Sequence, residues 1–144
     1  RRSSDLNEMT TALCLAAKRG VDIKIVTPGI PDKKLVFLLT QSYYKQLVEA
    51  GIHIYEYTPG FIHAKCFASD DKVATVGTIN MDYRSLYLHF ENGVFMYKND
   101  AVMQLKHDME KTFEISQRIT KEMCQGNLRK TLTQSVLRLL APLL

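Results

Sequence analysis

The sequence predicts an α/β domain in which helices flank a mixed β-sheet. Apolar residues recur at helical spacing over residues 6–19, 32–50 and 99–123, and short apolar segments lie between these ranges. In addition, a strand, a helix and a second strand follow one another over residues 22–57 with short connections. This order predicts a right-handed crossover with two parallel strands.

The first two elements have clear boundary signals. Asp5 followed three residues later by Glu8 resembles a capping box, which predicts a helix over residues 6–19 that stops at Gly20. The alternation in DIKIVTP then predicts a strand over residues 22–27. The proline and glycine that follow are typical chain breakers, so the strand is expected to end there.

The later elements complete the sheet. A second helix is expected over residues 32–50, followed by a strand with the sequence IHIYEYT. The segments IHAKCFAS and KVATVGT are joined through Asp70 and Asp71, which predicts an antiparallel hairpin with a tight polar turn. A further strand is predicted over residues 92–97, before the long helix over residues 99–123.

The chain is expected to divide into a domain over residues 1–125 and a final helix over residues 126–144. In that last segment, leucine and valine residues share one helical face, and the flank is basic without any acid. Such a helix either packs on the domain or lies on anionic lipid, and the sequence leaves both interpretations open.

Composition limits the class of protein. Hydrophobic residues make up 46% of the 144 residues and charged residues 24%, which is typical of a folded globular domain. The three cysteines, Cys14, Cys66 and Cys124, form no CxxC pair, so neither a disulfide framework nor a zinc knuckle is expected. No apolar run approaches the roughly 18 residues that cross a bilayer, and no signal peptide is visible. Because the chain begins with arginine, we expect it to be part of a longer protein.

Several polar residues are predicted to meet at one end of the hairpin. His63 and Lys65 lie two residues apart on an expected strand, so their side chains should share one face. The return strand ends near Thr78 and Asn80, which should bring one of these residues close to His63. A histidine, a fixed positive charge and an amide donor around one point suit phosphoryl or phosphodiester transfer.

These residues also form a recognisable motif. HAKCFASD has the pattern His-x-Lys-x₄-Asp, GTIN follows at the expected distance, and together they resemble the HKD motif of the phospholipase D superfamily. Residues 28–97 and the ending SVLRLLAPLL are similar to the C-terminal catalytic half of bacterial cardiolipin synthases. The resemblance implies a phospholipase D-like fold in which this chain is one of two similar lobes.

The resemblance also implies roles for individual residues. His63 is one of two histidines that face each other across a phosphodiester, while Lys65 and Asn80 hold the phosphate oxygens. Glu91 matches a carboxylate that contacts the catalytic histidine, although a solvated acid at a strand edge is the alternative. Thr78 either donates a further hydrogen bond to the substrate phosphate or is an ordinary strand residue. Asp70 belongs to the motif, and its role is expected to be mainly structural.

The function implied by the resemblance is phosphatidyl transfer between two phosphatidylglycerol molecules. The transfer passes through a phosphohistidine and releases glycerol. The alternatives are a homodimeric phosphodiesterase or nuclease of the same superfamily, and an isolated half-domain without activity. The expected partners are an N-terminal lobe that carries the second HKD motif, anionic phospholipid and, in the alternative, a second copy of the chain. Nucleic acid is not expected as a partner.

No cofactor or metal is expected. His53, His89 and His107 have neither HxH nor HExxH spacing, and the superfamily chemistry needs no metal. The parent protein is expected at the cytoplasmic membrane with an anchor outside this chain, whereas the chain itself is expected to be soluble.

Overall fold

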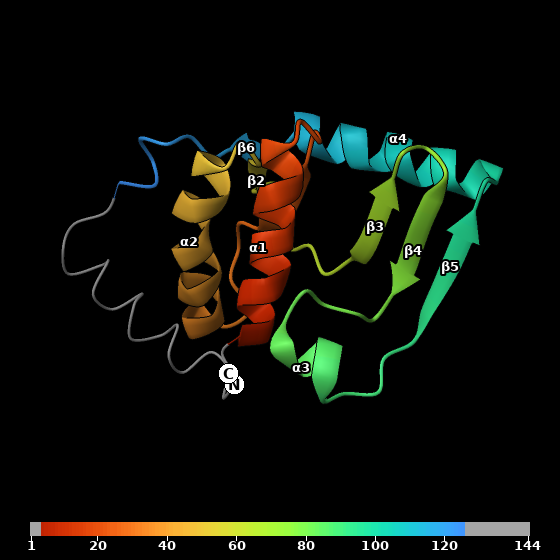
Figure 1. The fold of residues 1–144 in the computed structure, drawn as a ribbon, viewed down its shortest axis with the longest axis horizontal. Coiled ribbons are helices and arrows are strands. Elements are labelled where there is room, and N and C mark those ends of the chain that lie inside the picture. The colour runs from red at the N-terminus through yellow and green to blue at the C-terminus, as the bar shows by residue number, and fades with distance from the viewer. Residues whose placement is uncertain (1–3, 126–144) are drawn as a thin grey trace.

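A computed structural model describes residues 4–125 of the chain, and the predicted helix over residues 126–144 lies outside the described residues. The described part contains both helices and strands (Figure 1). In chain order they are α1 (Ser4–Lys18), β1 (Lys24–Pro28), α2 (Lys34–Glu49), β2 (His53–Tyr57), β3 (Lys65–Ser69), β4 (Val73–Gly77), α3 (Tyr83–Tyr87), β5 (Gly93–Tyr97), α4 (Asp100–Glu114) and β6 (Gln117–Arg118). The α/β class is therefore confirmed.

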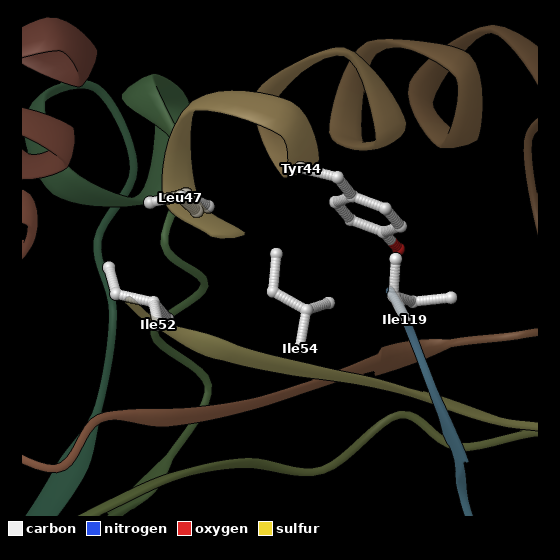
Figure 2. Close-up of a cluster of buried hydrophobic side chains, with 5 residues drawn as sticks. All are labelled: Tyr44, Leu47, Ile52, Ile54 and Ile119. Carbon is white, nitrogen blue, oxygen red and sulfur yellow. The ribbon is translucent and has the colours of Figure 1, made fainter. Parts of the chain in front are cut away.

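The first sheet has the strand order β1-β2-β6 and contains the predicted crossover. β1 and β2 are parallel, with Lys24 opposite His53, and α2 connects them. Side chains from α2 pack on this sheet to form a buried cluster (Figure 2). The cluster consists of Tyr44, Leu47, Ile52, Ile54 and Ile119. Ile54 is fully buried at the centre of the cluster.

The second sheet has the strand order β3-β4-β5 and is antiparallel throughout. The predicted hairpin is confirmed, with Lys65 opposite Gly77 and Ser69 opposite Val73. Its turn residues Asp70 and Asp71 have φ angles of 52° and 56°. Positive φ at two successive positions suits the twist of a tight hairpin, and aspartate tolerates this conformation better than most residues.

Two predictions about the elements were wrong, and one element was missed. The strands form two small sheets, of which only the first is mixed, where a single mixed sheet was predicted. The long helix ends at Glu114 and not at residue 123, because the following residues add β6 to the edge of β2, and Ile119 N donates to Ile54 O at 2.9 Å. The short helix α3 was not predicted.

Helix α4 contacts both sheets and runs across one end of the β3–β4–β5 sheet (Figure 1). Asn99 caps its first turn by accepting a hydrogen bond from Val102 N at 3.1 Å. Val102 is fully buried. Lys106 Nζ lies 2.5 Å from Asp71 Oδ1, which ties the helix to the hairpin turn. The turn end of the hairpin is thus fixed by α4, and α3 lies at the opposite end of the same sheet.

The helices of the described region are all too short, or insufficiently apolar, to cross a membrane.

Candidate active site

The candidate site lies at the end of the β3–β4–β5 sheet that is farther from α4 (Figure 1). Lys65 begins β3, Gly77 ends β4 and Gly93 begins β5, and these three residues stand side by side in the register. Because β3, β4 and β5 are antiparallel neighbours, the residues just outside these positions meet at the same end. They are His63, Thr78, Asn80 and Glu91.

Gly77 allows the two strands to approach closely at this end. A Cβ atom at this position would lie 2.2 Å from the carbonyl oxygen of Asn92 and 2.6 Å from the Cα of Gly93. Both distances are far below a van der Waals contact, and both neighbours are backbone atoms that cannot move aside. The glycine of the GTIN segment is therefore required by the packing of β4 against the start of β5.

His63 and Lys65 are adjacent, although not through the strand geometry that the sequence suggested. β3 begins only at Lys65, so His63 lies in the preceding loop and the rule of alternating faces does not apply to it. Lys65 Nζ donates to the backbone carbonyl oxygen of His63 at 2.7 Å. The His63 ring is exposed and stacks on Phe61, with 5.8 Å between ring centroids. The lysine therefore fixes the backbone of the loop, while the imidazole remains accessible.

Thr78 joins the end of β4 to the loop before β5. Its hydroxyl donates to the carboxylate of Glu91 and accepts from Asn92 N at 3.0 Å. Its own backbone N donates to Asn92 O at 2.9 Å. The Thr78 hydroxyl therefore donates to a protein carboxylate, and a contact of Thr78 with a substrate phosphate stays a prediction.

Glu91 is held by several positive or donating groups. Its side chain is 14% exposed. The Thr78 hydroxyl contributes most to lowering the Glu91 pKa below its ordinary value, followed by Ser85, and the nearby His89 and Lys65 side chains lower it further. His89 Nδ1 lies 3.9 Å from Glu91 Oε1. The carboxylate is therefore ionised at neutral pH.

The resemblance had placed this carboxylate on the catalytic histidine. Within residues 4–125, the hydrogen bonds and ion pairs of Glu91 include none with His63. The orienting role of Glu91 toward His63 therefore stays a prediction, and the contacts present are those to Thr78 and His89.

Asn80 is positioned by the short helix α3, which the sequence analysis missed. Asn80 Nδ2 donates to Ser85 Oγ at 3.3 Å. The helix is capped by Asp82, whose Oδ1 accepts from Ser85 N at 2.7 Å. An aspartate three residues before the serine is a helix-start signal, so this spacing could have revealed α3. No such local signal marks Ser85 as a neighbour of the site.

Asp70 lies at the other end of β3, away from the remaining motif residues. It occupies the hairpin turn, and its Oδ2 accepts from Ser69 Oγ at 3.2 Å. It also lines an open cavity of about 200 Å³ between the hairpin, β1 and α4. Its position separates it from His63, and the structural role expected for Asp70 stays a prediction.

An α/β domain that carries His-x-Lys-x₄-Asp and Gly-x-x-Asn around one hairpin has the features of a phospholipase D-like domain. The family model for the PLD-like domain of cardiolipin synthase matches residues 5–114. The chain therefore belongs to the PLD-like domain family of cardiolipin synthases.

Individual relatives support the same assignment. The chain is 42% identical over 138 residues to a cardiolipin synthase of Geobacillus kaustophilus. The aligned residues make up 95% of this chain and 28% of that protein. The chain is 38% identical over 139 residues to cardiolipin synthase 2 of Bacillus anthracis, covering 96% of this chain and 27% of that protein. An uncharacterized protein of Streptococcus mutans is 51% identical over 139 residues, which make up 30% of its length. The chain thus spans less than a third of these relatives.

Proposed function

We propose that this chain is the lobe of a cardiolipin synthase that carries one of its two catalytic histidines. The observation that carries the proposal is the meeting of an accessible His63, Lys65, Thr78 and Asn80 at one end of a sheet. The identity of 42% to a cardiolipin synthase over nearly the whole chain supports the same reaction.

In the proposed reaction, an imidazole nitrogen of one catalytic histidine attacks the phosphorus of phosphatidylglycerol. The bond from phosphorus to the glycerol headgroup oxygen breaks, and the second catalytic histidine protonates the leaving glycerol. The same second histidine then removes a proton from a hydroxyl of another phosphatidylglycerol. That oxygen attacks the phosphohistidine, the phosphorus–nitrogen bond breaks, and cardiolipin forms with the first histidine restored.

Lys65 and Asn80 supply the electrostatic part of this mechanism. Charge builds on the non-bridging phosphate oxygens as the phosphorus is attacked, and donors fixed in advance stabilise that charge. Lys65 is half-buried and anchored to the His63 carbonyl, so its positive charge stays close to the histidine. Asn80 is exposed, and only one of its two amide N–H groups is used by Ser85. The other is available to a phosphate oxygen.

We further propose that a second motif-bearing lobe covers one face of the β3–β4–β5 sheet. By the strand register, Lys65, Phe67, Phe95 and Tyr97 lie on the same face. Phe67 is 39% exposed, Phe95 67% and Tyr97 58%. Apolar surface of this extent usually marks an interaction site, and here it begins at the residue that would hold the phosphate. The relatives contain more than twice as much further sequence, which is enough to supply such a lobe.

The reaction is tested with the full-length parent protein and the 144-residue chain on phosphatidylglycerol vesicles, by measuring cardiolipin and glycerol. The matched variants are His63→Ala and His107→Ala, since His107 is an exposed histidine on α4. We expect His63→Ala to reduce transfer by about 10³-fold or more, as removal of such a catalytic group does elsewhere, and His107→Ala to leave it unchanged.

Each departure from this result has a definite meaning. Full transfer by His63→Ala would overturn the catalytic assignment. Hydrolysis by the chain alone, with a rate per chain that rises as the chain concentration rises, would instead indicate a homodimeric phosphodiesterase. Mass spectrometry of rapidly quenched protein should detect a peptide whose histidine carries the phosphatidyl group of the first phosphatidylglycerol.

A further inference from the structure

Three segments of the chain meet at the end of the molecule that holds the candidate site. Residues 58–64 lead into the start of β3, and residues 78–92, which contain α3, connect the end of β4 to the start of β5. The parallel strands β1 and β2 end side by side, so residues 29–34 begin at this same end, where Gly29 N donates to Tyr57 O at 2.9 Å (Figure 1). We call the surface formed by these three segments the site-end surface.

Large apolar side chains are exposed in all three segments. They include Ile30, Phe61, Met81, Leu88 and Phe90. Phe90 has a relative exposure of 107%, so its ring is as accessible as in an extended peptide. Single exposed apolar residues are common on soluble proteins, whereas a group of them at one end of a molecule marks a binding surface.

The apolar part of the site-end surface reaches the candidate catalytic histidine through Phe61. The Phe61 ring stacks on the His63 imidazole, with 5.8 Å between ring centroids and 17° between ring planes. Both side chains are exposed. A phosphodiester at His63 therefore has apolar protein surface directly beside it. Phosphatidylglycerol has a matching division, because its acyl chains lie to one side of its phosphate.

Basic side chains accompany the apolar ones. Lys33 and Lys34 lie at the start of α2 and Arg84 lies on α3, and all three are exposed. Among the described residues, none of the three takes part in an ion pair. Asp32 is an exposed acid in the same segments and offsets one of these charges. The exposed side chains of the site-end surface are therefore apolar with an excess of positive charge.

We propose that the site-end surface docks on an anionic phospholipid bilayer, with Phe61, Leu88 and Phe90 entering the interfacial region. The inference rests on the proposed function, because it states how the site reaches a substrate that stays in a membrane. Exposed aromatic and aliphatic side chains mixed with lysine and arginine suit an anionic headgroup layer. Lysine is depleted in interfaces between proteins, which favours lipid over a protein partner here.

The two kinds of contact divide the work of docking. Lys33, Lys34 and Arg84 attract anionic headgroups, and Phe61 brings the boundary of the bilayer to His63. The phosphate of phosphatidylglycerol lies in the headgroup layer, so it reaches the histidine while its acyl chains remain among other lipids. The acyl chains therefore need not enter water, which would be unfavourable.

A single introduced tryptophan tests the contact directly, because the chain contains no tryptophan of its own. Phe90→Trp and Phe95→Trp are compared in the 144-residue chain, since both replace exposed phenylalanines, one on the site-end surface and one on a face of the β3–β4–β5 sheet. With phosphatidylglycerol vesicles, the fluorescence of Phe90→Trp should shift to shorter wavelength and be quenched by brominated acyl chains. Phe95→Trp should show neither change. Phosphatidylcholine vesicles should affect both variants much less.

Sedimentation with the same vesicles measures the affinities. Phe90→Ser should weaken binding to phosphatidylglycerol vesicles by about ten-fold, because an apolar side chain is lost from the interfacial region. Lys33→Gln and Lys34→Gln should each weaken it by about five-fold, as a basic residue near an anionic surface contributes. Phe95→Ser should bind as the wild type does. All four side chains are exposed, so none of these changes removes a buried contact.

Three results would overturn the proposal. The first is fluorescence of Phe90→Trp that vesicles do not change. The second is wild-type affinity of Phe90→Ser, as expected if residues 126–144 carry all of the binding. The third is a fall in the thermal midpoint of the lipid-free full-length protein with Phe90→Ser as large as with Phe95→Ser, because a second lobe would then cover the site-end surface.

Vesicle binding needs no turnover, so it is separable from the proposed function. Quenching of Phe90→Trp in a protein that forms no cardiolipin would count against the proposed function and support the docking. Cardiolipin formation by the wild type, together with unquenched Phe90→Trp, would support the function and count against the docking.

Discussion

The two sheets of this domain differ in what covers them. The β1–β2–β6 sheet packs against α2 and contains the cluster around Ile54, which is fully buried. The β3–β4–β5 sheet exposes apolar side chains on both faces, Val76 and Val94 on one and Phe67 and Phe95 on the other. The candidate catalytic residues lie at one end of this second sheet. The buried apolar cluster therefore belongs to the first sheet, whereas the candidate catalytic residues lie at one end of the second. The second sheet also has exposed apolar surface that is available to a partner.

This division agrees with the chemistry proposed for the site. Phosphodiester transfer with two histidines needs a site between two lobes, so the residues that act cannot be enclosed by their own lobe. The exposed His63 ring and the apolar face beside Lys65 satisfy that need. The helix α4 contacts both sheets and so holds the exposed sheet on the buried one.

The strongest test of the comparison is truncation of a side chain in the buried cluster. Ile54→Ala should lower the free energy of unfolding by about 3 kcal/mol, because it opens a cavity at a fully buried position. Val94→Ala, at a residue that is 63% exposed, should change it by less than about 0.5 kcal/mol. Urea denaturation of the 144-residue chain measures both. Similar losses for the two variants would show that the sheets do not differ in this way.

A second test concerns the face that we assign to the second lobe. Phe95→Ser should leave the stability of the chain alone within about 0.5 kcal/mol, since Phe95 is 67% exposed. In the full-length protein the same change should lower the thermal midpoint, because buried aromatic residues at interfaces often contribute more than about 1 kcal/mol.

Val94→Ser is the control for this test, because Val94 lies on the opposite face of the same strand and is also well exposed. Val94→Ser should lower the thermal midpoint of the full-length protein by less than Phe95→Ser does. An equal or larger effect of Val94→Ser would place the second lobe on the other face of the sheet.

The smallest expected effect comes from the ionisation of Glu91. The folded chain lowers the pKa of this carboxyl, so the ionised form adds stability above its ordinary pKa of 4.5, and that contribution is lost as pH falls through the lowered value. The stability difference between the wild type and Glu91→Gln should therefore shrink as pH is lowered from about 7 to about 3. Urea midpoints at several pH values measure it. If the stability difference between the wild type and Glu91→Gln stays constant with pH, Glu91 does not stabilise the fold through its ionised form.

Local patterns were enough to predict much of the fold. The crossover over residues 22–57 follows from periodicity and glycine stops, and the hairpin follows from two β-like segments on either side of Asp70 and Asp71. The end of α4 was missed because residues 115–118 have no local signal against helix. Residues 117 and 118 pair with β2 instead of continuing the helix. This pairing becomes favourable only when Ile119 packs into the cluster around Ile54.

The candidate site shows the same limit. The motif identified His63, Lys65, Asn80 and Glu91 from their types and spacing, yet the argument from strand parity failed because His63 precedes β3. Ser85 was overlooked because it becomes a neighbour of Asn80 only through the capped turn of α3. Side-chain types can be read along a chain, but the directions of their hydrogen bonds depend on which segments pack together.

By itself, the sequence determined the α/β class, the parallel crossover, the tight hairpin turn and the candidate residues for phosphodiester transfer. Each of these depends on spacing or on conformational preferences that act within a few residues. Only the tertiary structure decided that Glu91 binds Thr78, that Ser85 holds Asn80, and that one sheet is buried while the other exposes Phe95. These features come from contacts between segments far apart in the chain, which no local preference specifies.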